Sequence, residues 1–154
     1  MLEEQLRKCR SAQKALFRLT PEVRNECLKR IVYTLKSNIP QILKANEKDI
    51  LQARKRQLSE AFIERLSLTE ERILSMAEGV NHIISLDSPV GSIAEELRRP
   101  NGLIIQKELV PFGVIAVIFE SRPNVCVDIA ALCLKTANAC VLLSLIHISE
   151  PTRP

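Results

Sequence analysis

The chain is poor in the residues that mark several classes of protein. Its 154 residues contain no Trp, one Tyr and four Phe, so few rings are available to stack on nucleic-acid bases. No run of eighteen apolar residues occurs, and the N-terminal segment MLEEQLRKCR lacks the apolar core of a secretory signal. We therefore expect a cytoplasmic protein with no nucleic acid and no membrane among its partners.

Glycine is scarce as well, and cysteine never occurs in pairs. The four glycines form neither G-x-G-x-x-G nor G-x-x-x-x-G-K, so any nucleotide would be held without those loops. The five cysteines are Cys9, Cys27, Cys126, Cys133 and Cys140. None lies in a C-x-x-C pair or near a His at metal-binding spacing, so we predict reduced, buried thiols and no metal site.

Apolar residues at steps of three and four predict helices over residues 1–86. The first apolar stripe consists of Leu2, Leu6, Cys9, Ala12, Leu16 and Leu19. Thr20-Pro21-Glu22 has the pattern of a helix start, and the next stripe is Val23, Cys27, Ile31 and Leu35. A third segment follows Pro40. The stretch from Ser67 to Glu70 has a capping-box pattern, and the helix after it is expected to bury Ile73, Met76, Val80 and Ile83.

The period changes after Gly91. Residues 92–98 and 103–110 flank Pro100-Asn101-Gly102, which predicts a β-hairpin that leans on another surface or chain. Residues 114–119 and 139–142 are short apolar runs around a helix at about residues 125–136. This βαβ pattern predicts two parallel strands, covered on both faces and joined by a right-handed crossover.

The first of these strands ends in the polar residues Glu120, Ser121 and Arg122, followed by Pro123 and Asn124. Open α/β proteins bind ligands beyond the carboxyl ends of their strands. The Asn124 amide could donate to a developing oxyanion or cap the helix. Arg122 could grip a phosphate or carboxylate, or pair internally with Glu120 or Asp128. Glu120 itself is more typical of a structural hydrogen-bond acceptor.

Four other residues attract attention as possible functional groups. Cys133 lies in mid-helix among apolar residues, which favours a buried, inert thiol, whereas Cys126 is closer to the polar cluster. His82 is expected to be a surface or half-buried structural residue. Lys135 lies in the last turn of its helix, where a cation complements the helix dipole.

The segment PFGVIAVIFESRPNVCVDIAALCLKTAN, residues 111–138, resembles the glutamate-5-semialdehyde dehydrogenase (gamma-glutamyl phosphate reductase) family, within the aldehyde dehydrogenase superfamily. Upstream, LTPEVRNECLKRI, ILKANEKDILQAR, RLSLTEERI and DSPVG also resemble segments of that family. The resemblance covers residues 1–142, and its E-S-R-P-N-V cluster is specific within the superfamily. At residue 137 the family usually has Gly, and the Ala here predicts a different or a strained turn.

The resemblance implies an α/β fold, namely a truncated form of the Rossmann-like fold of aldehyde dehydrogenases. Residues 1–90 would be the helical part of the cofactor domain, 91–110 a hairpin arm for oligomerisation, and 111–142 the start of the βαβ core. The implied reaction is the NADPH-dependent reduction of L-glutamyl 5-phosphate to the semialdehyde with release of phosphate, in proline biosynthesis. A catalytic Cys would attack the acyl phosphate. Asn124 would be the oxyanion donor and Arg122 would bind the substrate, and the full-length protein would form a homo-oligomer.

The family's catalytic Cys lies well downstream of residue 142, so this N-terminal fragment is expected to be inactive. The last twelve residues, LSLIHISEPTRP (143–154), resemble the in-frame translation of a transposon adapter used in sequencing libraries. We therefore expect a non-native tail, which removes His147 and Glu150 from consideration. The alternatives are another acylating aldehyde dehydrogenase and a non-catalytic helical interaction module.

Overall fold

Five helices precede all the strands in this computed structural model, which describes residues 2–120 and 122–144. The helices are α1 (Leu2–Arg18), α2 (Pro21–Ser37), α3 (Ile39–Lys55), α4 (Glu60–Leu66) and α5 (Glu70–Ser85). The strands β1 (Ile93–Arg98), β2 (Ile104–Glu108) and β3 (Val114–Phe119) follow, then α6 (Pro123–Lys135) and β4 (Ala139–Ser144). The expected tail, His147 and Glu150 included, lies outside the described residues apart from Leu143 and Ser144, which belong to β4.

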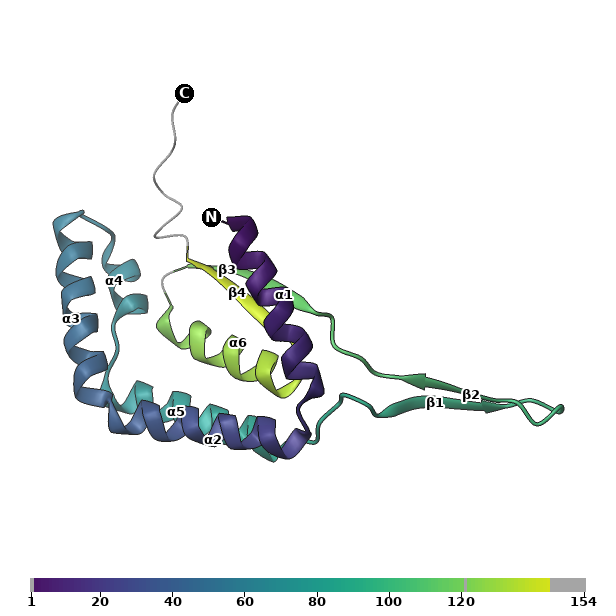
Figure 1. Ribbon diagram of the computed structural model, residues 1–154. Helices are drawn as coiled ribbons and strands as arrows, with labels where there is room; N and C mark the ends of the chain where they lie inside the picture. The colour runs from purple at the N-terminus through teal and green to yellow at the C-terminus, as the bar shows by residue number, and fades with distance from the viewer. Residues whose placement is uncertain (1, 121, 145–154) are drawn as a thin grey trace, which may run out of the picture.

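The main hydrophobic core lies where α2, α5 and α6 pack together (Figure 1). It is formed by Leu28, Val32, Ala77, Val80, Ile83 and Ala131. The predicted stripe of α5 is confirmed, because Ile73, Met76, Val80 and Ile83 are all buried. A second, smaller cluster of Ala53, Ile63 and Leu66 joins α3 to α4. The helices therefore have their own core, independent of the strands.

The predicted stripe of α2 is confirmed only in part, because Ile31 and Leu35 pack half-buried against the core and Cys27 is half-buried. The buried residues of this helix are Arg24, Leu28 and Val32, whereas Val23 is 45% exposed. Arg24 can be buried because its guanidinium donates to the Leu19 carbonyl at 2.6 Å and to the Ser88 hydroxyl at 3.1 Å. An arginine with such partners can replace an apolar residue on the inner face of the helix.

Three hydroxyl side chains cap helices, those of Thr20, Ser59 and Thr69, and not all of them do so in the predicted way. Thr20 caps α2 as predicted, since its hydroxyl accepts from the Val23 amide and Pro21 begins the helix. The predicted capping box starting at Ser67 is wrong. Thr69 is the N-cap of α5 and accepts from the Arg72 amide at 3.2 Å, while the Ser67 hydroxyl donates to the Ile63 carbonyl at the end of α4. The box fails because α5 begins two residues later than it requires.

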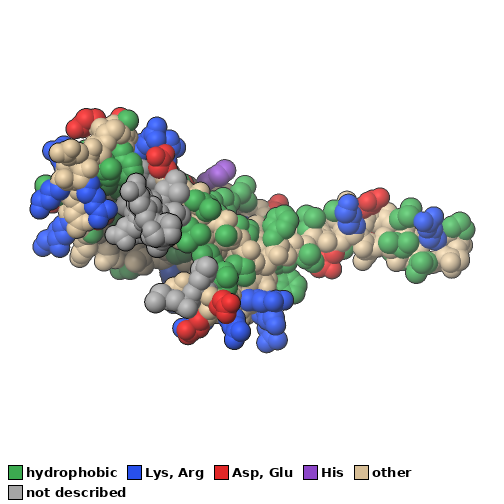
Figure 2. All heavy atoms as spheres, turned by 90° about the horizontal axis from the view of Figure 1, so that it is seen from above, with side chains coloured by type: hydrophobic (Ala, Val, Ile, Leu, Met, Phe, Trp, Pro, Cys, Tyr) green, Lys and Arg blue, Asp and Glu red, His purple; other side chains and the backbone are tan. Residues whose placement is uncertain are grey.

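The strands β1 and β2 form an antiparallel hairpin that projects from the helices as a long arm (Figures 1 and 2). Its turn consists of Pro100, Asn101 and Gly102, with Gly102 at φ 85°. The Gly102 amide donates to the Arg99 carbonyl, and the Asn101 side chain accepts from the Leu103 amide. Every residue of both strands is exposed, so the predicted hairpin is confirmed as a structure held by its own backbone pairing.

The strands β3 and β4 pair in parallel, from Val114 opposite Ala139 to Phe119 opposite Ser144. Asn138 fixes the start of the pair, because its side-chain oxygen accepts from the Gly113 amide at 2.8 Å. In Figure 1 β4 lies between α1 and α6. The prediction that both strands are covered on both faces is wrong, since Ile118 is 63% exposed and β3 has no fully buried residue. Two helices are too few to cover both faces of the pair.

Candidate active-site hollow

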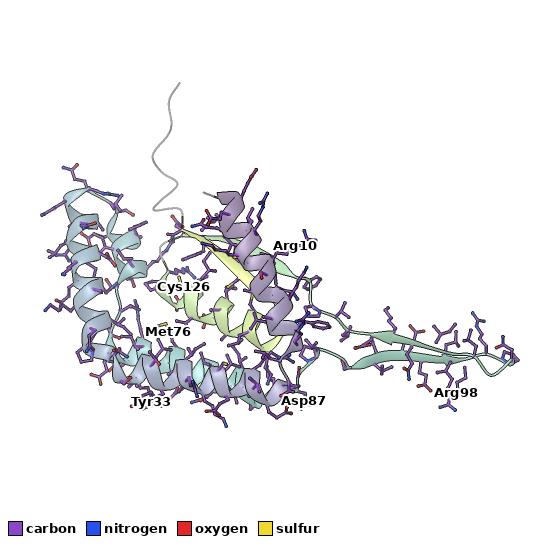
Figure 3. All side chains as sticks on the ribbon, viewed as in Figure 1. Arg10, Tyr33, Met76, Asp87, Arg98 and Cys126 are labelled. Atoms are coloured by element: carbon purple, nitrogen blue, oxygen red, sulfur yellow. The ribbon has the colours of Figure 1, made fainter. Side chains whose placement is uncertain are left out.

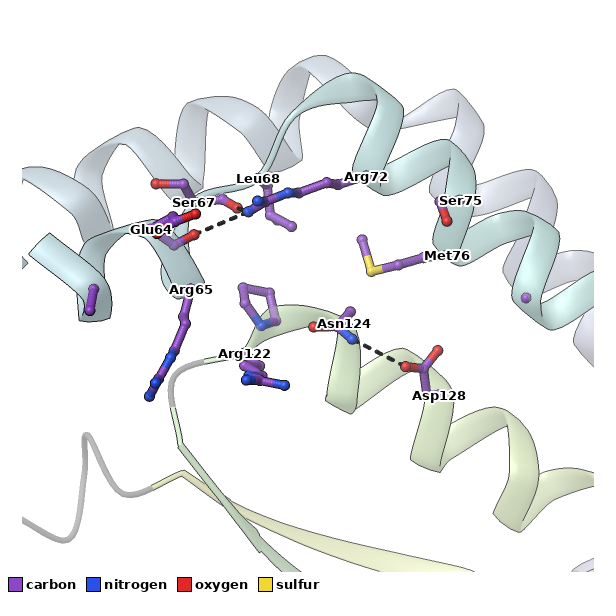
Figure 4. A pocket seen from close by; sticks show the side chains of 13 residues that line it. Glu64, Arg65, Ser67, Leu68, Arg72, Ser75, Met76, Arg122, Asn124 and Asp128 are labelled. Carbon is purple, nitrogen blue, oxygen red and sulfur yellow. Dashed lines mark hydrogen bonds between the residues drawn. The ribbon is translucent and has the colours of Figure 1, made fainter.

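An open hollow of about 750 Å³ lies where β3 ends and α6 begins, facing the start of α5 (Figure 4). We call it the α5–α6 hollow. It is lined by Ala61, Glu64, Arg65, Ser67, Leu68, Arg72, Ser75, Met76, Gly79, Arg122, Pro123, Asn124 and Asp128. Two of the residues predicted to be functional, Arg122 and Asn124, are in this set.

The α5 side of the hollow is positioned by a buried asparagine. Asn46 donates to the Leu66 carbonyl and accepts from the Leu68 amide, both at 2.8 Å. These two bonds hold the connection between α4 and α5 against α3. Beyond it, Arg72, Ser75, Met76 and Gly79 recur at helical spacing on the face of α5 that lines the hollow.

Two of the three arginines of the hollow are engaged. Arg72 donates to the carbonyls of Glu64 and Ser67, at 3.1 and 2.6 Å, and so satisfies the last turn of α4. Arg65 forms an exposed ion pair with Glu120 at 3.2 Å. Among the described residues, the Arg122 side chain makes no hydrogen bond or ion pair, and only its backbone carbonyl accepts, from the Val125 amide. Its guanidinium is therefore available for an anion that enters the hollow.

The position of Asn124 corrects one of the two alternatives for this residue. Helix α6 has Arg122 as its N-cap residue, without a side-chain cap, and Pro123 as its first residue. Asn124 is therefore inside the first turn, and the N-cap alternative is wrong because the helix begins one residue too early for it. The Asn124 side chain is exposed and donates to the Asp128 carboxylate at 3.3 Å (Figure 4).

The internal pairing suggested for Arg122 is also wrong. Glu120 accepts from Arg65 instead, in agreement with its predicted role as a hydrogen-bond acceptor. Asp128 accepts from Asn124. Each of the two carboxylates is therefore bound by a side chain other than that of Arg122.

The cysteines differ from the prediction that all of them are buried. All five are free, but only Cys133 is buried and the other four are half-buried. Burial raises the pKa of the Cys133 thiol to about 11, and burial also raises the pKa of Cys126 (Figure 3). A raised pKa leaves little thiolate near neutral pH, so neither cysteine is an activated nucleophile.

The remaining candidates have structural positions. His82 is exposed on α5. Lys135 is buried, and its ammonium donates to the Asn25 side chain at 2.9 Å and to the Ile84 carbonyl at 3.0 Å, although burial lowers its pKa. Ala137 has φ 55°, so the strained form of the expected turn is the one observed. No group of three metal-ligating side chains, and no helix suited to span a membrane, occurs in the described part of the chain.

The residues that α4 and α5 contribute to the hollow were not predicted from the sequence. Arg65, Arg72 and Met76 carry no local signal, because an arginine or methionine on an amphipathic helix is ordinary. Gly79 is different. It lies inside a helix, where glycine is unfavourable, and that irregularity is a signal that could have been noticed.

Comparison with known proteins gives a consistent result, although no family model matches the chain. Gamma-glutamyl phosphate reductase of Carboxydothermus hydrogenoformans is 51% identical over 136 residues, which are 88% of this chain and 33% of that protein. The enzyme of the same name from Halalkalibacterium halodurans is 43% identical over 141 residues, 92% of this chain and 34% of that protein. The chain spans about a third of the length of the curated relatives it matches.

Solved structures agree with these relatives. The crystal structure of gamma-glutamyl phosphate reductase from Thermotoga maritima superposes with a TM-score of 0.89 at 36% identity, covering 93% of this chain and 34% of that one. The Saccharomyces cerevisiae structure of the same name gives a TM-score of 0.85 at 32% identity, covering 90% and 35%. The predicted α/β fold and the predicted resemblance are both confirmed. Over the part that it spans, the chain is therefore homologous in sequence and in fold to gamma-glutamyl phosphate reductases.

Proposed function

We propose that the complete protein containing this chain reduces L-glutamyl 5-phosphate to L-glutamate 5-semialdehyde, releasing phosphate, as a cytoplasmic enzyme of proline biosynthesis. The homology supports the reaction class. One observation supports placing this reaction at the α5–α6 hollow. Asn124 and an unpaired Arg122 side chain lie together there, beyond the end of β3. An acyl phosphate needs both an oxyanion donor and a cation for its phosphate.

Each of the two residues has a distinct proposed role. The Asn124 amide donates to the acyl oxygen as it gains negative charge, which is typically worth about 3–4 kcal/mol in the transition state. The Arg122 guanidinium binds the phosphate or a carboxylate of the substrate through paired N–H groups. The nucleophilic thiolate is assigned to the rest of the protein, because Cys126 and Cys133 both have raised pKa values.

The proposed hydride donor is NADPH. The described residues offer it no phosphate loop, since the junction of β3 and α6 contains no glycine and the four glycines of the chain lie elsewhere. Residues 2–120 and 122–144 therefore provide no glycine-rich phosphate loop for a dinucleotide. We assign the binding of the cofactor to the rest of the protein.

The substitution Asn124→Ala in the complete protein tests the proposal. We expect kcat for NADPH-dependent reduction of glutamyl phosphate to fall by about 10²–10³. Asn101→Ala, the same change on the arm, is the matched control and should leave kcat unchanged. An unchanged kcat in Asn124→Ala would remove the oxyanion role. If the protein reduced an acyl-coenzyme A thioester and left the acyl phosphate unchanged, the alternative of an acylating aldehyde dehydrogenase would hold instead.

A second test uses the 154-residue chain alone, for which we propose no activity. Purified chain should leave NADPH absorbance constant in the presence of glutamyl phosphate, because burial raises the pKa values of Cys126 and Cys133, the two thiols of α6. Adding the complete protein to the same cuvette is the positive control. Steady consumption of NADPH by the chain alone would contradict this proposal.

We also propose that the arm joins subunits of a homo-oligomer. It exposes apolar side chains along both strands, among them Leu97, Ile104 and Ile105, at 44%, 50% and 45%. A two-stranded ribbon without another layer is marginal in water. Ile104→Lys should lower the sedimentation coefficient of the complete protein, while Tyr33→Lys, an exposed position on α2 (Figure 3), should not. Unchanged sedimentation of Ile104→Lys would exclude the arm from the interface.

A further inference from the structure

Neither backbone conformation nor packing within the described residues requires a glycine at position 79, in the interior of α5. Its backbone does not have a positive φ, and a Cβ built on it would meet no atom within 4 Å. Glycine also destabilises a helix relative to alanine. On the same face of α5 lie Arg72, Ser75 and Met76, which line the α5–α6 hollow. The missing side chain therefore keeps open a part of the hollow that the fold itself does not fill.

Across the hollow, Asp128 presents a carboxylate that no cation neutralises in the described part of the chain. Within that part, the only hydrogen bond to its side chain comes from the Asn124 amide, at 3.3 Å. The arginines around it have other partners or none: Arg65 pairs with Glu120, Arg72 binds the carbonyls of α4, and Arg122 is unpaired. Two carboxylates, those of Asp128 and Glu64, therefore line a hollow that also contains three arginines, and such a lining suits a ligand that carries both signs of charge.

We propose that Asp128 receives the α-ammonium group of the amino-acid substrate and so determines specificity. This inference rests on the proposed function. Asn124 and Asp128 lie one helical turn apart on the same face of α6, a rise of about 6 Å along its axis. In a glutamyl group the α-nitrogen is a few bonds from the acyl carbon, so one substrate can reach both side chains. Gly79, on the opposite wall, leaves room for the substrate between α5 and α6.

The proposal assigns Asp128 a role that can be separated from support of Asn124. An Asp128 that binds ammonium matters only for substrates that carry the amino group. An Asp128 that merely orients the Asn124 amide matters equally for every aldehyde. The two roles therefore predict different selectivity, even if both lower the overall rate.

The test runs the complete protein in the oxidative direction, where aldehyde, phosphate and NADP⁺ give acyl phosphate, NADPH and a proton. Glutamate 5-semialdehyde is compared with 5-oxopentanoate, the same chain without the amino group. In Asp128→Asn we expect kcat/KM for the amino substrate to fall by about 10- to 100-fold, mainly through KM, because a charge-assisted hydrogen bond is lost. The value for 5-oxopentanoate should stay within about twofold.

The control variants keep the outcomes distinct. Asp128→Glu retains the charge and should recover part of the preference for the amino substrate. Far-ultraviolet circular dichroism reports that each variant is folded. An equal loss with both substrates, or no loss with either, would overturn the inference while leaving the proposed function intact. A wild-type protein that oxidises neither aldehyde would overturn the proposed function, and the inference with it.

Gly79→Ala provides an independent check on the opposite wall of the hollow. The added methyl group should raise the thermal midpoint, because alanine favours the helix. It should also raise KM for glutamate 5-semialdehyde several-fold, because it enters space that the substrate uses. A raised midpoint with an unchanged KM would show that this space is not used, and would count against the placement of the substrate.

Discussion

The helical body and the arm contain similar apolar residues in opposite environments. In the body, Leu28, Ala77, Val80 and Ala131 are fully buried between three helices. In the arm, both strands are exposed along their whole length, and Figure 2 shows apolar side chains on the surface of this projection. Burial therefore depends on the layers that pack against an element, and the apolar content of the element alone does not produce it.

This difference separates the sources of stability in the two regions. The body is stabilised by removal of apolar surface from water, and the arm by cross-strand pairing and turn geometry. On the arm, Glu96 accepts from Gln106 on the facing strand at 2.8 Å and from Arg98 at 3.0 Å. Such exposed contacts contribute little each, so the arm should tolerate substitutions that unfold the body.

The largest expected effect comes from the same truncation made in each region. Leu28→Ala removes a fully buried side chain from the core and should lower the free energy of unfolding by about 3–5 kcal/mol. Leu103→Ala, on a residue 55% exposed in the arm, should change it by about 0.5 kcal/mol or less. Urea unfolding followed by circular dichroism measures both. Equal costs would contradict the division between the two regions.

Removal of an asparagine side chain from each region compares the polar contacts of the body with those of the arm. Asn46 binds the Leu66 carbonyl and the Leu68 amide in the interior, so Asn46→Ala leaves buried polar groups unpaired and should cost about 2–3 kcal/mol. Asn101 makes one exposed bond in the turn of the arm, and Asn101→Ala should cost about 0.5 kcal/mol. The urea midpoints measure the difference. A small cost for Asn46→Ala would show that water replaces its two bonds.

The sequence allowed the arm and the βαβ unit to be predicted because their signals are local. Alternating apolar residues around Pro100-Asn101-Gly102 are typical of a hairpin, and apolar runs around a helix are typical of parallel strands. The burial of Arg24 on the inner face of α2 was not predicted, for the opposite reason. Arg24 can be buried because its guanidinium donates to the Leu19 carbonyl and to the Ser88 hydroxyl. Ser88 is 64 residues away, so no local pattern indicates its contact with Arg24.

The hollow was predictable only in part, for the same physical reason. Arg122 and Asn124 follow a strand directly, so a general rule for α/β folds indicates them. Arg65, Arg72 and Gly79 reach the hollow from helices more than forty residues earlier in the chain. Their approach depends on how α5 packs against α6, which periodicity does not determine.

A smaller and opposite pair of effects is expected at two positions with positive φ. Ala137, at φ 55° after α6, has the conformation that glycine favours, so Ala137→Gly should raise the free energy of unfolding by about 1 kcal/mol. Gly102, at φ 85° in the arm, should show the reverse: Gly102→Ala should weaken hydrogen-exchange protection of the hairpin by about 1 kcal/mol. Gln57→Gly, at φ 55° after α3, is the matched control for the first change and should also stabilise.

The smallest expected effects are on the pH dependence of stability, which should differ between the body and the arm. The pKa of Cys133 is raised to about 11 from 9.0 by burial, so the neutral thiol stabilises the body below pH 9.0, and this contribution is lost as the pH rises toward 11. On the arm, hydrogen bonds from Gln106 and Arg98 lower the pKa of Glu96 below 4.5, so its contribution is present above pH 4.5 and is lost on further acidification.

Amide hydrogen exchange, corrected for the intrinsic effect of pH, should resolve these two losses. Protection in α6 should decline on the alkaline side and protection in β1 on the acid side. Cys133→Ala should flatten the first profile without altering the second, and Glu96→Gln should do the reverse, since each variant removes the titrating group from one region only. If either variant changed both profiles, the arm and the body would unfold as one cooperative unit, and the independence inferred from their burial would be wrong.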